Sequence, residues 1–310
     1  MEKPLVSYVL TTYNIESFIE ESVKCAFEQD YENLEIILSD DCSSDHTFDI
    51  MKKMAEEYDG PHKIILNRNE QNMGISQHMS KCYIDLAGGE IIIAAHGDDI
   101  SLPERTSKEV EFLINNPEYT AVSMGVVATD KNGMPLHTKA HNATVNEFHS
   151  YDFKSGGNIP APSRAFLKRV MTTFGPLNED CPTEDELITF RALLLGKNAF
   201  LPEVSTYYRK HENSNSNPAF FDRFPLEKIL KQQDDDMATA VRLGLISEQE
   251  RNDKYNILYK NMVIRKRYRN YFSKRDVASL LKLIKPNDIS FRRKLSYIKE
   301  HILYLKDKAI

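Results

Sequence analysis

The chain has 310 residues, of which 41% are hydrophobic and 28% charged, with a formal net charge of −6. This composition is typical of a folded globular protein and argues against a disordered or fibrous one. The four cysteines lie far apart without a Cys-x-x-Cys pair, and no apolar run approaches the roughly 18 residues that cross a membrane. We therefore expect a cytoplasmic protein without a zinc site, a signal peptide or a membrane span.

The first hundred residues alternate short apolar runs with segments of helical periodicity. We predict strands at 5–10, 34–38, 63–66 and 90–96, and helices at 15–27, from an N-cap at Asp45, and at 75–87. This alternation predicts an α/β fold with a mostly parallel sheet flanked by helices. No Gly-x-Gly-x-x-Gly follows the first strand, so a dinucleotide site of that type is not expected.

The remaining chain is less regular until its last third. We predict a helix from Pro103 to about 117, short strands within 121–174, a helix at 184–195 and a strand at 199–208. A polar linker at 213–218 precedes a largely helical region. The expected organisation is a first domain at 1–217, with a boundary near residue 100, and a helical appendage at 218–310.

Polar clusters follow each of the four predicted strands of the first hundred residues. They are Thr11 to Asn14 with Glu16, Ser39 to Thr47, Asn67 to Gly74, and Gly97 to Asp99. The carboxyl ends of parallel strands lie at one edge of a sheet, so these clusters are expected to converge where open α/β sheets bind ligands. Each cluster alone has a structural explanation, because Asn, Asp, Ser and Gly are the usual turn residues.

The fourth cluster holds two adjacent carboxylates, Asp98 and Asp99. Neighbouring side chains of an extended segment point in opposite directions, so one carboxylate can face a metal while the other faces a sugar or ribose. Carboxylate oxygens suit Mg²⁺ and Mn²⁺, which usually bridge to substrate phosphates. The structural alternative is an acidic turn that closes a strand.

Taken together, these motifs resemble family 2 glycosyltransferases of the GT-A fold, over about residues 4–215. The resemblance implies that 1–217 is the catalytic domain, with a nucleotide-binding half at 1–100 and an acceptor-side half at 101–217. The resemblance implies that Thr11, Tyr13, Asn14 and Glu16 belong to the donor site, where the aromatic ring stacks on the base. It implies that the loop from Asp40 and Asp41 binds the edge of uracil or thymine. Further donor contacts are implied for Arg68, Asn72, Gly74 and Asp98, with Asp99 as the metal ligand.

One position departs from the family pattern: His96 stands where an acidic residue is common. The resemblance also implies a catalytic base within a Glu-Asp pair at the start of a later helix, which here is Glu184-Asp185. We assign Asp185 as the base that takes the proton from the acceptor hydroxyl, and Glu184 as a donor-site residue. The structural alternative is a capping box from Thr183 to Glu186, and both can hold together.

The segment after the predicted strand at 199–208 resembles the family's Tyr-Arg-x-His loop. His211 is the second candidate metal ligand, and Arg209 or Lys210 could neutralise the departing diphosphate. A histidine in a polar loop is, however, often only solvated.

The resemblance implies a Mn²⁺- or Mg²⁺-dependent inverting hexosyl- or N-acetylhexosaminyl-transferase that acts in surface polysaccharide synthesis. The expected donor is a UDP-sugar, or else a dTDP-sugar, and the expected acceptor is a glycan or lipid-linked saccharide. Two alternatives are a nucleotidylyltransferase, which normally has a Gly-rich basic loop after the first strand, and a non-catalytic nucleotide-binding module. Thr11 to Asn14 lacks such a loop, and both Asp99 and Asp185 are present, which favours the glycosyltransferase.

The C-terminal region has a charge opposite to the rest of the chain. From Arg265 onward it carries 14 Lys and Arg against 4 Asp and Glu, a balance of +10, so the preceding residues carry −16. Leu295, Ile298, Ile302 and Leu305 recur at helical spacing among basic residues, a pattern typical of elements that lie on membrane surfaces. Packing on the catalytic domain, with the charged face in water, is the first explanation, and contact with a membrane surface is the alternative. A nucleic-acid partner is not expected because no recognisable binding module is present.

Overall fold

The computed structural model describes residues 3–136, 148–156, 159–179, 181, 183–212 and 225–308. The chain divides into two compact units, Met1–Asn217 and Pro218–Ile310. The predicted polar linker at 213–218 lies outside the described residues.

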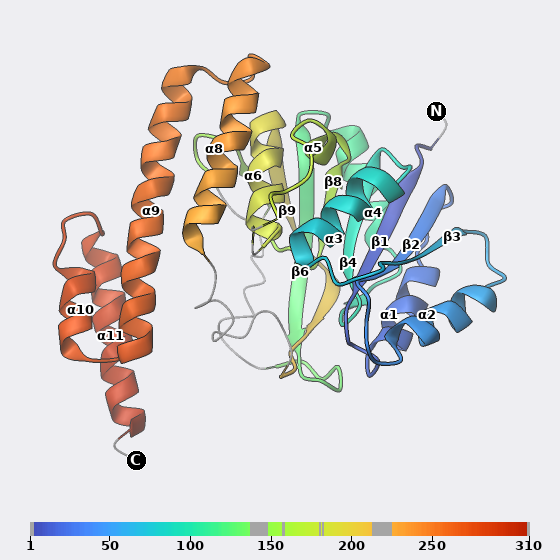
Figure 1. Ribbon diagram of the computed structural model, residues 1–310, viewed down its shortest axis with the longest axis horizontal. Coiled ribbons are helices and arrows are strands. Elements are labelled where there is room, and N and C mark those ends of the chain that lie inside the picture. Colours follow the sequence, from blue (N-terminus) through green and yellow to red (C-terminus); the bar gives the residue numbers. More distant parts are fainter. Residues whose placement is uncertain are drawn as a thin grey trace. The chain divides into compact units, whose positions relative to one another are not determined.

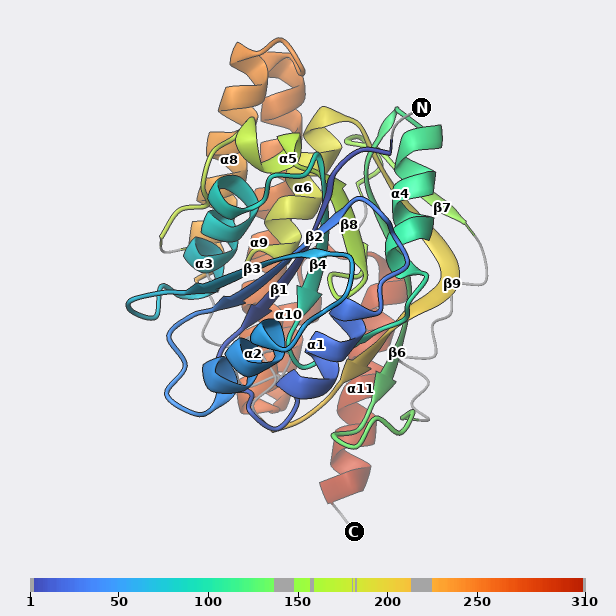
Figure 2. The same cartoon turned by 90° about the vertical axis from the view of Figure 1, so that its right-hand side faces the viewer.

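The described residues of the first unit contain a nine-stranded sheet, shown in Figure 2. Its order is β3-β2-β1-β4-β8-β6-β9-β5, with β7 paired to β9. The strands are β1 (Val6–Thr12), β2 (Leu34–Asp40), β3 (Lys63–Arg68), β4 (Ile91–His96), β5 (Ile100–Ser101), β6 (Tyr119–Thr129), β7 (His149–Tyr151), β8 (Arg164–Leu167) and β9 (Lys197–Arg209).

The sheet is mixed, and the expectation of a mostly parallel sheet holds only for its first half. β1 pairs in parallel with β2 and β4, and β2 pairs in parallel with β3. β8 then runs antiparallel to both β4 and β6, and β5 and β7 are antiparallel to β9. The four parallel strands therefore end at the same edge, which is the edge that carries the polar clusters.

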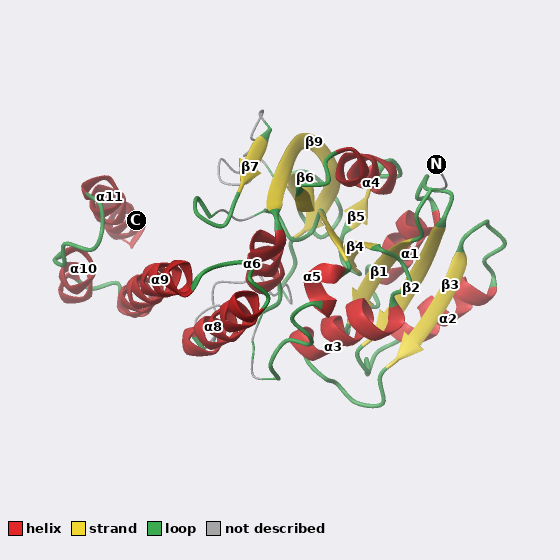
Figure 3. Cartoon of the chain, turned by 90° about the horizontal axis from the view of Figure 1, so that it is seen from above, coloured by secondary structure: helices red, strands yellow, loops and turns green. Residues whose placement is uncertain are grey.

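An apolar core of described residues lies between one face of the sheet and three helices. Figure 3 shows the sheet and these helices from above. These helices are α1 (Ile19–Phe27), α2 (Thr47–Glu56) and α4 (Arg105–Asn115). Val6, Tyr8 and Leu10 of β1 alternate toward this core, as the two-residue period of a strand requires. Both faces of β1 and β2 are buried, which explains their near-continuous apolar sequences.

The other face of the sheet contacts a second layer of helices. It includes α3 (Ile75–Lys81), a single π-helical turn η1 (Cys82–Leu86), α5 (Arg169–Thr172) and α6 (Asp185–Leu195). Tyr83 packs edge-on against Phe166 of β8 with ring centroids 5.2 Å apart. The helix predicted at 75–87 thus changes to a π-helix after Lys81, and its backbone becomes extended at Ala87.

Two other local predictions were wrong. His46, and not Asp45, is the N-cap residue of α2, and the Asp45 carboxylate instead accepts hydrogen bonds from the amides of Thr47 and Glu16.

Instead of short strands alone, the chain forms the 11-residue β6, which pairs in parallel with the 13-residue β9. The register shifts at Gly125, where a Cβ would lie 2.8 Å from the Pro202 carbonyl oxygen.

The described residues of the second unit are helical, as predicted, and Figure 1 shows them in orange and red. They form α8 (Leu226–Arg242), α9 (Glu248–Lys274), α10 (Val277–Ile284) and α11 (Phe291–Lys308). A capping box of Ser247 and Glu250 begins α9. A separate small core of aromatic and aliphatic side chains from α9, α10 and α11 includes Tyr271 and Leu283. Among the described residues, no helix combines the length and the apolar character needed to cross a bilayer.

Candidate active site

The loops that follow β1 and β2 hold each other in place. Asn14 has a left-handed backbone (φ 50°), and its side-chain oxygen accepts a hydrogen bond from the Ser44 amide at 2.8 Å. Its own amide donates to the Ser43 hydroxyl at 2.8 Å, and Glu16 accepts from the His46 amide at 2.9 Å. Asn14 and Glu16, predicted as donor contacts, therefore join the two loops. Thr11 is buried, whereas Tyr13 is 47% exposed, so its ring is open to a ligand.

Asp40 and Asp41 are both buried and already hydrogen-bonded within the protein. Asp40 accepts from the Ser43 amide at 2.8 Å and lies 3.6 Å from Nε of Arg68. Asp41 accepts from the Asn69 side chain at 2.8 Å and from the amides of Met73 and Gly74 at 2.9 and 3.0 Å. The carboxylate of Asp41 therefore fixes the turn between β3 and α3.

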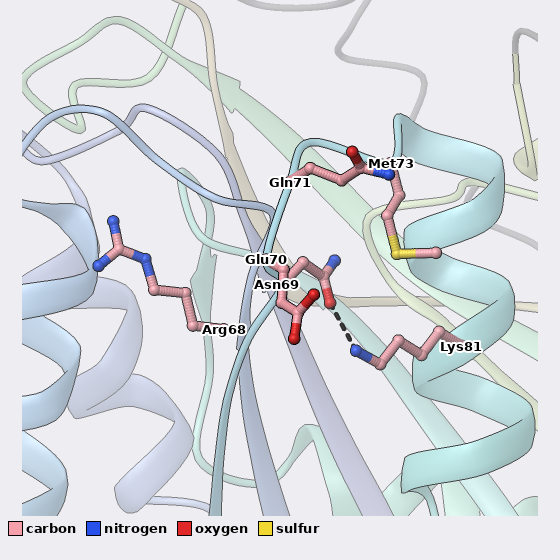
Figure 4. A pocket seen from close by; sticks show the side chains of 6 residues that line it. All are labelled: Arg68, Asn69, Glu70, Gln71, Met73 and Lys81. Carbon is pink, nitrogen blue, oxygen red and sulfur yellow. Dashed lines mark hydrogen bonds between the residues drawn. The ribbon is translucent and has the colours of Figure 1, made fainter.

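That turn forms one side of a pocket of about 330 Å³, drawn in Figure 4. Its lining residues are Arg68, Asn69, Glu70, Gln71, Met73 and Lys81. Lys81 donates to the Asn69 side-chain oxygen at 2.8 Å, and Arg68 extends away from this pair, as Figure 4 shows. Asn72 accepts from the Gly74 amide at 2.9 Å, and Gly74 has a φ of 76°, a conformation that favours glycine.

The adjacent carboxylates after β4 lie in different surroundings. The carboxylate of Asp98 accepts a hydrogen bond from Nε2 of His211 at 3.0 Å, and the Asp98 side chain is 22% exposed. Asp99 is 5% exposed, and its Oδ1 accepts from the backbone amide of Arg209 at 3.1 Å. The structure thus places Asp98, and not the expected Asp99, beside His211.

The surroundings of Asp99 disfavour a bare negative charge. Burial and the neighbouring Asp98 carboxylate raise the pKa of Asp99 well above its usual range, although the Arg209 amide opposes the rise. The other oxygen of Asp99, Oδ2, is buried and makes no hydrogen bond with the described residues.

Arg209, predicted as a donor contact, has its side chain against α1. It is 2% exposed, pairs with Glu21 and lies over the Phe18 ring, with 4.8 Å between the guanidinium carbon and the ring centroid. The same Phe18 ring lies 4.8 Å from the ring of His211. Phe18 and Glu21 thus hold the end of β9, a role that the sequence analysis missed because nothing in the helical pattern of α1 distinguishes them.

The Glu-Asp pair stands at the start of α6, as predicted. The expected capping box is absent: Glu184 is the N-cap residue without a side-chain cap, and the Thr183 hydroxyl donates to the Asp185 carboxylate. Arg164 of β8 donates from Nη1 to the backbone carbonyl of Asp185 at 2.9 Å. Asp185 is half-buried, which leaves its carboxylate within reach of solvent.

Glu184 is buried behind Asp185. Burial raises the pKa of its carboxyl to about 8, and Asp185 adds to the rise while Arg164 opposes it. One Glu184 oxygen lies 3.9 Å from Nη2 of Arg164. Arg164 is fully buried, and a lone arginine in a short strand gave no signal by which sequence analysis could identify it.

His96 ends β4 and is influenced electrostatically by both acidic groups of the site. Burial lowers the pKa of its imidazole, while the carboxylates of Asp98 and Asp185 both oppose that shift. Its Nε2 atom is buried and makes no hydrogen bond with the described residues. The end of β4 therefore brings the Asp98–His211 pair and the Glu184-Asp185 pair to the same edge of the sheet.

Comparison with solved structures supports the expected GT-A fold. Staphylococcus aureus TarS, solved with UDP-GlcNAc, superposes with a TM-score of 0.66 at 17% identity, covering 91% of this chain and 79% of that one. The mannosyltransferase PcManGT from Pyrobaculum calidifontis, solved with GDP-Man and Mn²⁺, gives a TM-score of 0.61 at 16% identity, covering 98% and 81%.

Curated proteins of related sequence include two from Bacillus subtilis. The putative glycosyltransferase EpsE is 35% identical over 131 residues, or 42% of this chain and 46% of EpsE. The putative teichuronic acid biosynthesis glycosyltransferase TuaG is 29% identical over 219 residues, or 69% of this chain and 82% of TuaG. The match thus spans about half the length of EpsE. The family model "Glycosyl transferase family 2" matches residues 7–170, more than half of the chain, and the chain belongs to this family.

Proposed function

We propose that this chain is a metal-dependent inverting glycosyltransferase that transfers a sugar from a nucleotide-sugar to a hydroxyl of a glycan or lipid-linked saccharide. The observation that carries the proposal is the 3.0 Å contact between Asp98 and His211 after β4, with the Asp185 carboxylate near enough to influence the His96 imidazole that ends this strand. TarS, solved with UDP-GlcNAc, favours a UDP-sugar as donor. The name of TuaG favours a role in surface polysaccharide synthesis.

The residues present fit a divalent cation. Asp98 and His211 offer an oxygen and a nitrogen on adjacent side chains, and these donor types suit Mn²⁺ as well as Mg²⁺. Among the described residues no three His, Cys, Asp or Glu side chains gather as a complete ligand set, so substrate phosphates and water would supply the other ligands. When bound, the cation would stabilise negative charge on the departing diphosphate. We assign Asp98 and His211 as its ligands, and Asp99 as the residue that positions β9.

The donor site extends from the cation ligands to the loops after β1, β2 and β3. The exposed ring of Tyr13 offers a stacking surface for the base, and the pocket beside Arg68 offers polar groups for its edge. Asp41 acts on this site by fixing the turn that carries Asn72 and Gly74.

Asp185 is the proposed catalytic base. As the acceptor oxygen attacks the anomeric carbon, the bond from that carbon to the diphosphate oxygen breaks, and the acceptor proton passes to the Asp185 carboxylate. Arg164 holds the backbone of Asp185, and the Thr183 hydroxyl orients its side chain. Burial raises the pKa of the neighbouring Glu184 carboxyl to about 8, so Glu184 holds its proton at neutral pH.

Calorimetric titration of UDP with and without Mn²⁺, combined with turnover of Asp185→Asn, tests the proposal. We expect Mn²⁺-dependent UDP binding in both proteins, and a loss of turnover of at least about a hundredfold in the variant, because a general base typically contributes that much. Glu186→Gln makes the same chemical change one residue later and should retain turnover. Failure of the folded wild type to bind any nucleoside diphosphate would overturn the proposal, and binding without turnover would favour a non-catalytic module.

A further inference from the structure

Helix α11 carries an apolar stripe that no described side chain covers. Phe291 is 75% exposed, and Leu295, Ile302 and Leu305 are 48–49% exposed. Ile298, which is half-buried, continues the same line. These five residues follow one another at alternating spacings of four and three, which places them on one side of an α-helix. We call them the α11 stripe.

A different side of α11 already anchors the helix in its own unit. Tyr297 and His301 are buried, with ring centroids 5.2 Å from Tyr268 and 5.8 Å from Tyr271 of α9. Glu300 accepts from Arg275 at 2.8 Å. The α11 stripe is therefore a second apolar surface, because the helix satisfies the core of its unit without it.

The charge around the α11 stripe indicates the chemistry of its partner. Arg292 and Lys299 are exposed, and on a helical projection they lie beside the stripe. The chain from Arg265 onward carries a balance of +10. Two copies that paired through the stripe would bring these positive charges together, whereas an anionic partner would neutralise them.

We propose that α11 binds the surface of a bilayer that contains anionic lipids. The α11 stripe enters the boundary between headgroups and acyl chains, and Arg292 and Lys299 contact lipid phosphates. An exposed apolar stripe flanked by basic residues is the pattern of helices that lie in the membrane interface. This docking surface goes beyond the proposed transfer reaction, because it involves no residue of the donor or catalytic site.

Vesicle sedimentation of the full chain tests the proposal. We expect the wild type to sediment with vesicles of phosphatidylglycerol and phosphatidylcholine but not with phosphatidylcholine alone, and to dissociate at about 0.5 M NaCl. Each basic residue near an anionic surface contributes to the free energy of binding. The double variant Arg292→Glu/Lys299→Glu should therefore bind the anionic vesicles more than about tenfold more weakly than the wild type. The double variant Leu295→Ser/Ile302→Ser should bind these vesicles at least about fivefold more weakly than the wild type.

The matched control removes apolar side chains of similar exposure from another helix of the same unit. Ile257 and Tyr259 of α9 are 52% and 51% exposed, and Ile257→Ser/Tyr259→Ser should bind vesicles like the wild type. All the substituted side chains are exposed, so circular dichroism should show folded variants.

Three results would overturn the proposal while leaving the transfer reaction intact. One is equal sedimentation of the wild type with and without anionic lipid. Another is a wild-type dimer in analytical ultracentrifugation that Leu295→Ser/Ile302→Ser dissociates without any change in vesicle binding. The third is a loss of turnover on a soluble acceptor in this variant with unchanged vesicle binding, which would assign the α11 stripe to the catalytic unit.

Discussion

Asp98 and Asp99 are adjacent in the sequence but have different structural surroundings. Asp98 lies beside the imidazole of His211 and retains access to solvent, whereas Asp99 is buried and accepts a hydrogen bond from the amide of Arg209. The side chain of Asp98 is 22% exposed and Asp99 is 5% exposed, so a cation has the more open approach to Asp98. This difference, and not the order of the two residues, supports Asp98 as the ligand.

The two alanine variants should therefore behave differently. Asp98→Ala should weaken Mn²⁺-dependent UDP binding at least tenfold in calorimetry with little change in Tm. Asp99→Ala removes the acceptor for a buried amide and should lower the free energy of unfolding by about 1–3 kcal/mol. Loss of Mn²⁺-dependent binding in Asp99→Ala at an unchanged Tm would instead make Asp99 the ligand, as the sequence analysis predicted.

The buried carboxyl of Glu184 makes the free energy of unfolding depend on pH. Its carboxyl has a pKa of about 8 in the folded protein and about 4.3 in an unfolded chain. Between these values the folded state holds a proton that the unfolded state has lost, so the contribution of Glu184 to stability falls as the pH rises and levels off above about 8.

Glu184→Gln should remove this loss of stability at higher pH while keeping the shape of the side chain. Each unit of pKa difference corresponds to about 1.4 kcal/mol, so the variant should gain stability relative to the wild type from pH 5 to pH 8. Urea unfolding of both proteins across this range measures the gain. A constant difference between the two curves would contradict the assigned protonation state.

At the scale of elements, the site is built from turns that depend on buried side chains. Asp41 of the loop after β2 accepts three hydrogen bonds from the turn that joins β3 to α3. Hydrogen bonds to a charged group contribute more than those to a neutral one, so this carboxylate has a large part in the shape of the turn.

Asp41→Asn should loosen that turn more than the rest of the fold. The amide group of asparagine places a donor where the Gly74 or Met73 amide also donates, at a cost of about 1–3 kcal/mol. We expect weaker UDP binding and faster hydrogen exchange at residues 69–74, measured by mass spectrometry. Unchanged exchange in this segment, with β1 and β4 as internal references, would show that the turn does not depend on Asp41.

Local sequence patterns predicted the elements whose burial is regular and missed those that depend on distant partners. β1, β2 and β4 are short β-branched runs that are buried on both faces, and each was predicted within about two residues. The 11-residue β6 was missed because its polar positions, such as Thr120 and Ser123, bond to distant carbonyl groups. Likewise, Glu184 is the N-cap of α6, because the Thr183 hydroxyl bonds to the side chain of Asp185 and not to a backbone amide of the helix.

At the scale of the whole molecule, each of the two units has an apolar core among its described residues, and these two cores share no residue. One lies under α1, α2 and α4 of the first unit, and the other lies among α9, α10 and α11 of the second. All the predicted donor, metal and base residues belong to the first unit.

Leu283→Ala should destabilise the second unit alone. Leu283 is fully buried in the smaller core, and its truncation should cost about 2–5 kcal/mol. We expect an earlier helical melting step by circular dichroism, and an unchanged dissociation constant for UDP. A single unfolding transition together with weakened UDP binding would mean that the two units fold as one.

The sequence by itself determined the parallel strands, the polar loops at their ends, the helical second unit and the family of the chain. These features depend on local patterns of apolar, turn and charged residues. Only the tertiary structure decided that the sheet is mixed, that Asp98 and not Asp99 meets His211, and that Arg164 lies beneath Glu184 and Asp185. These outcomes depend on burial and on contacts between residues far apart in the chain, which a local pattern does not encode.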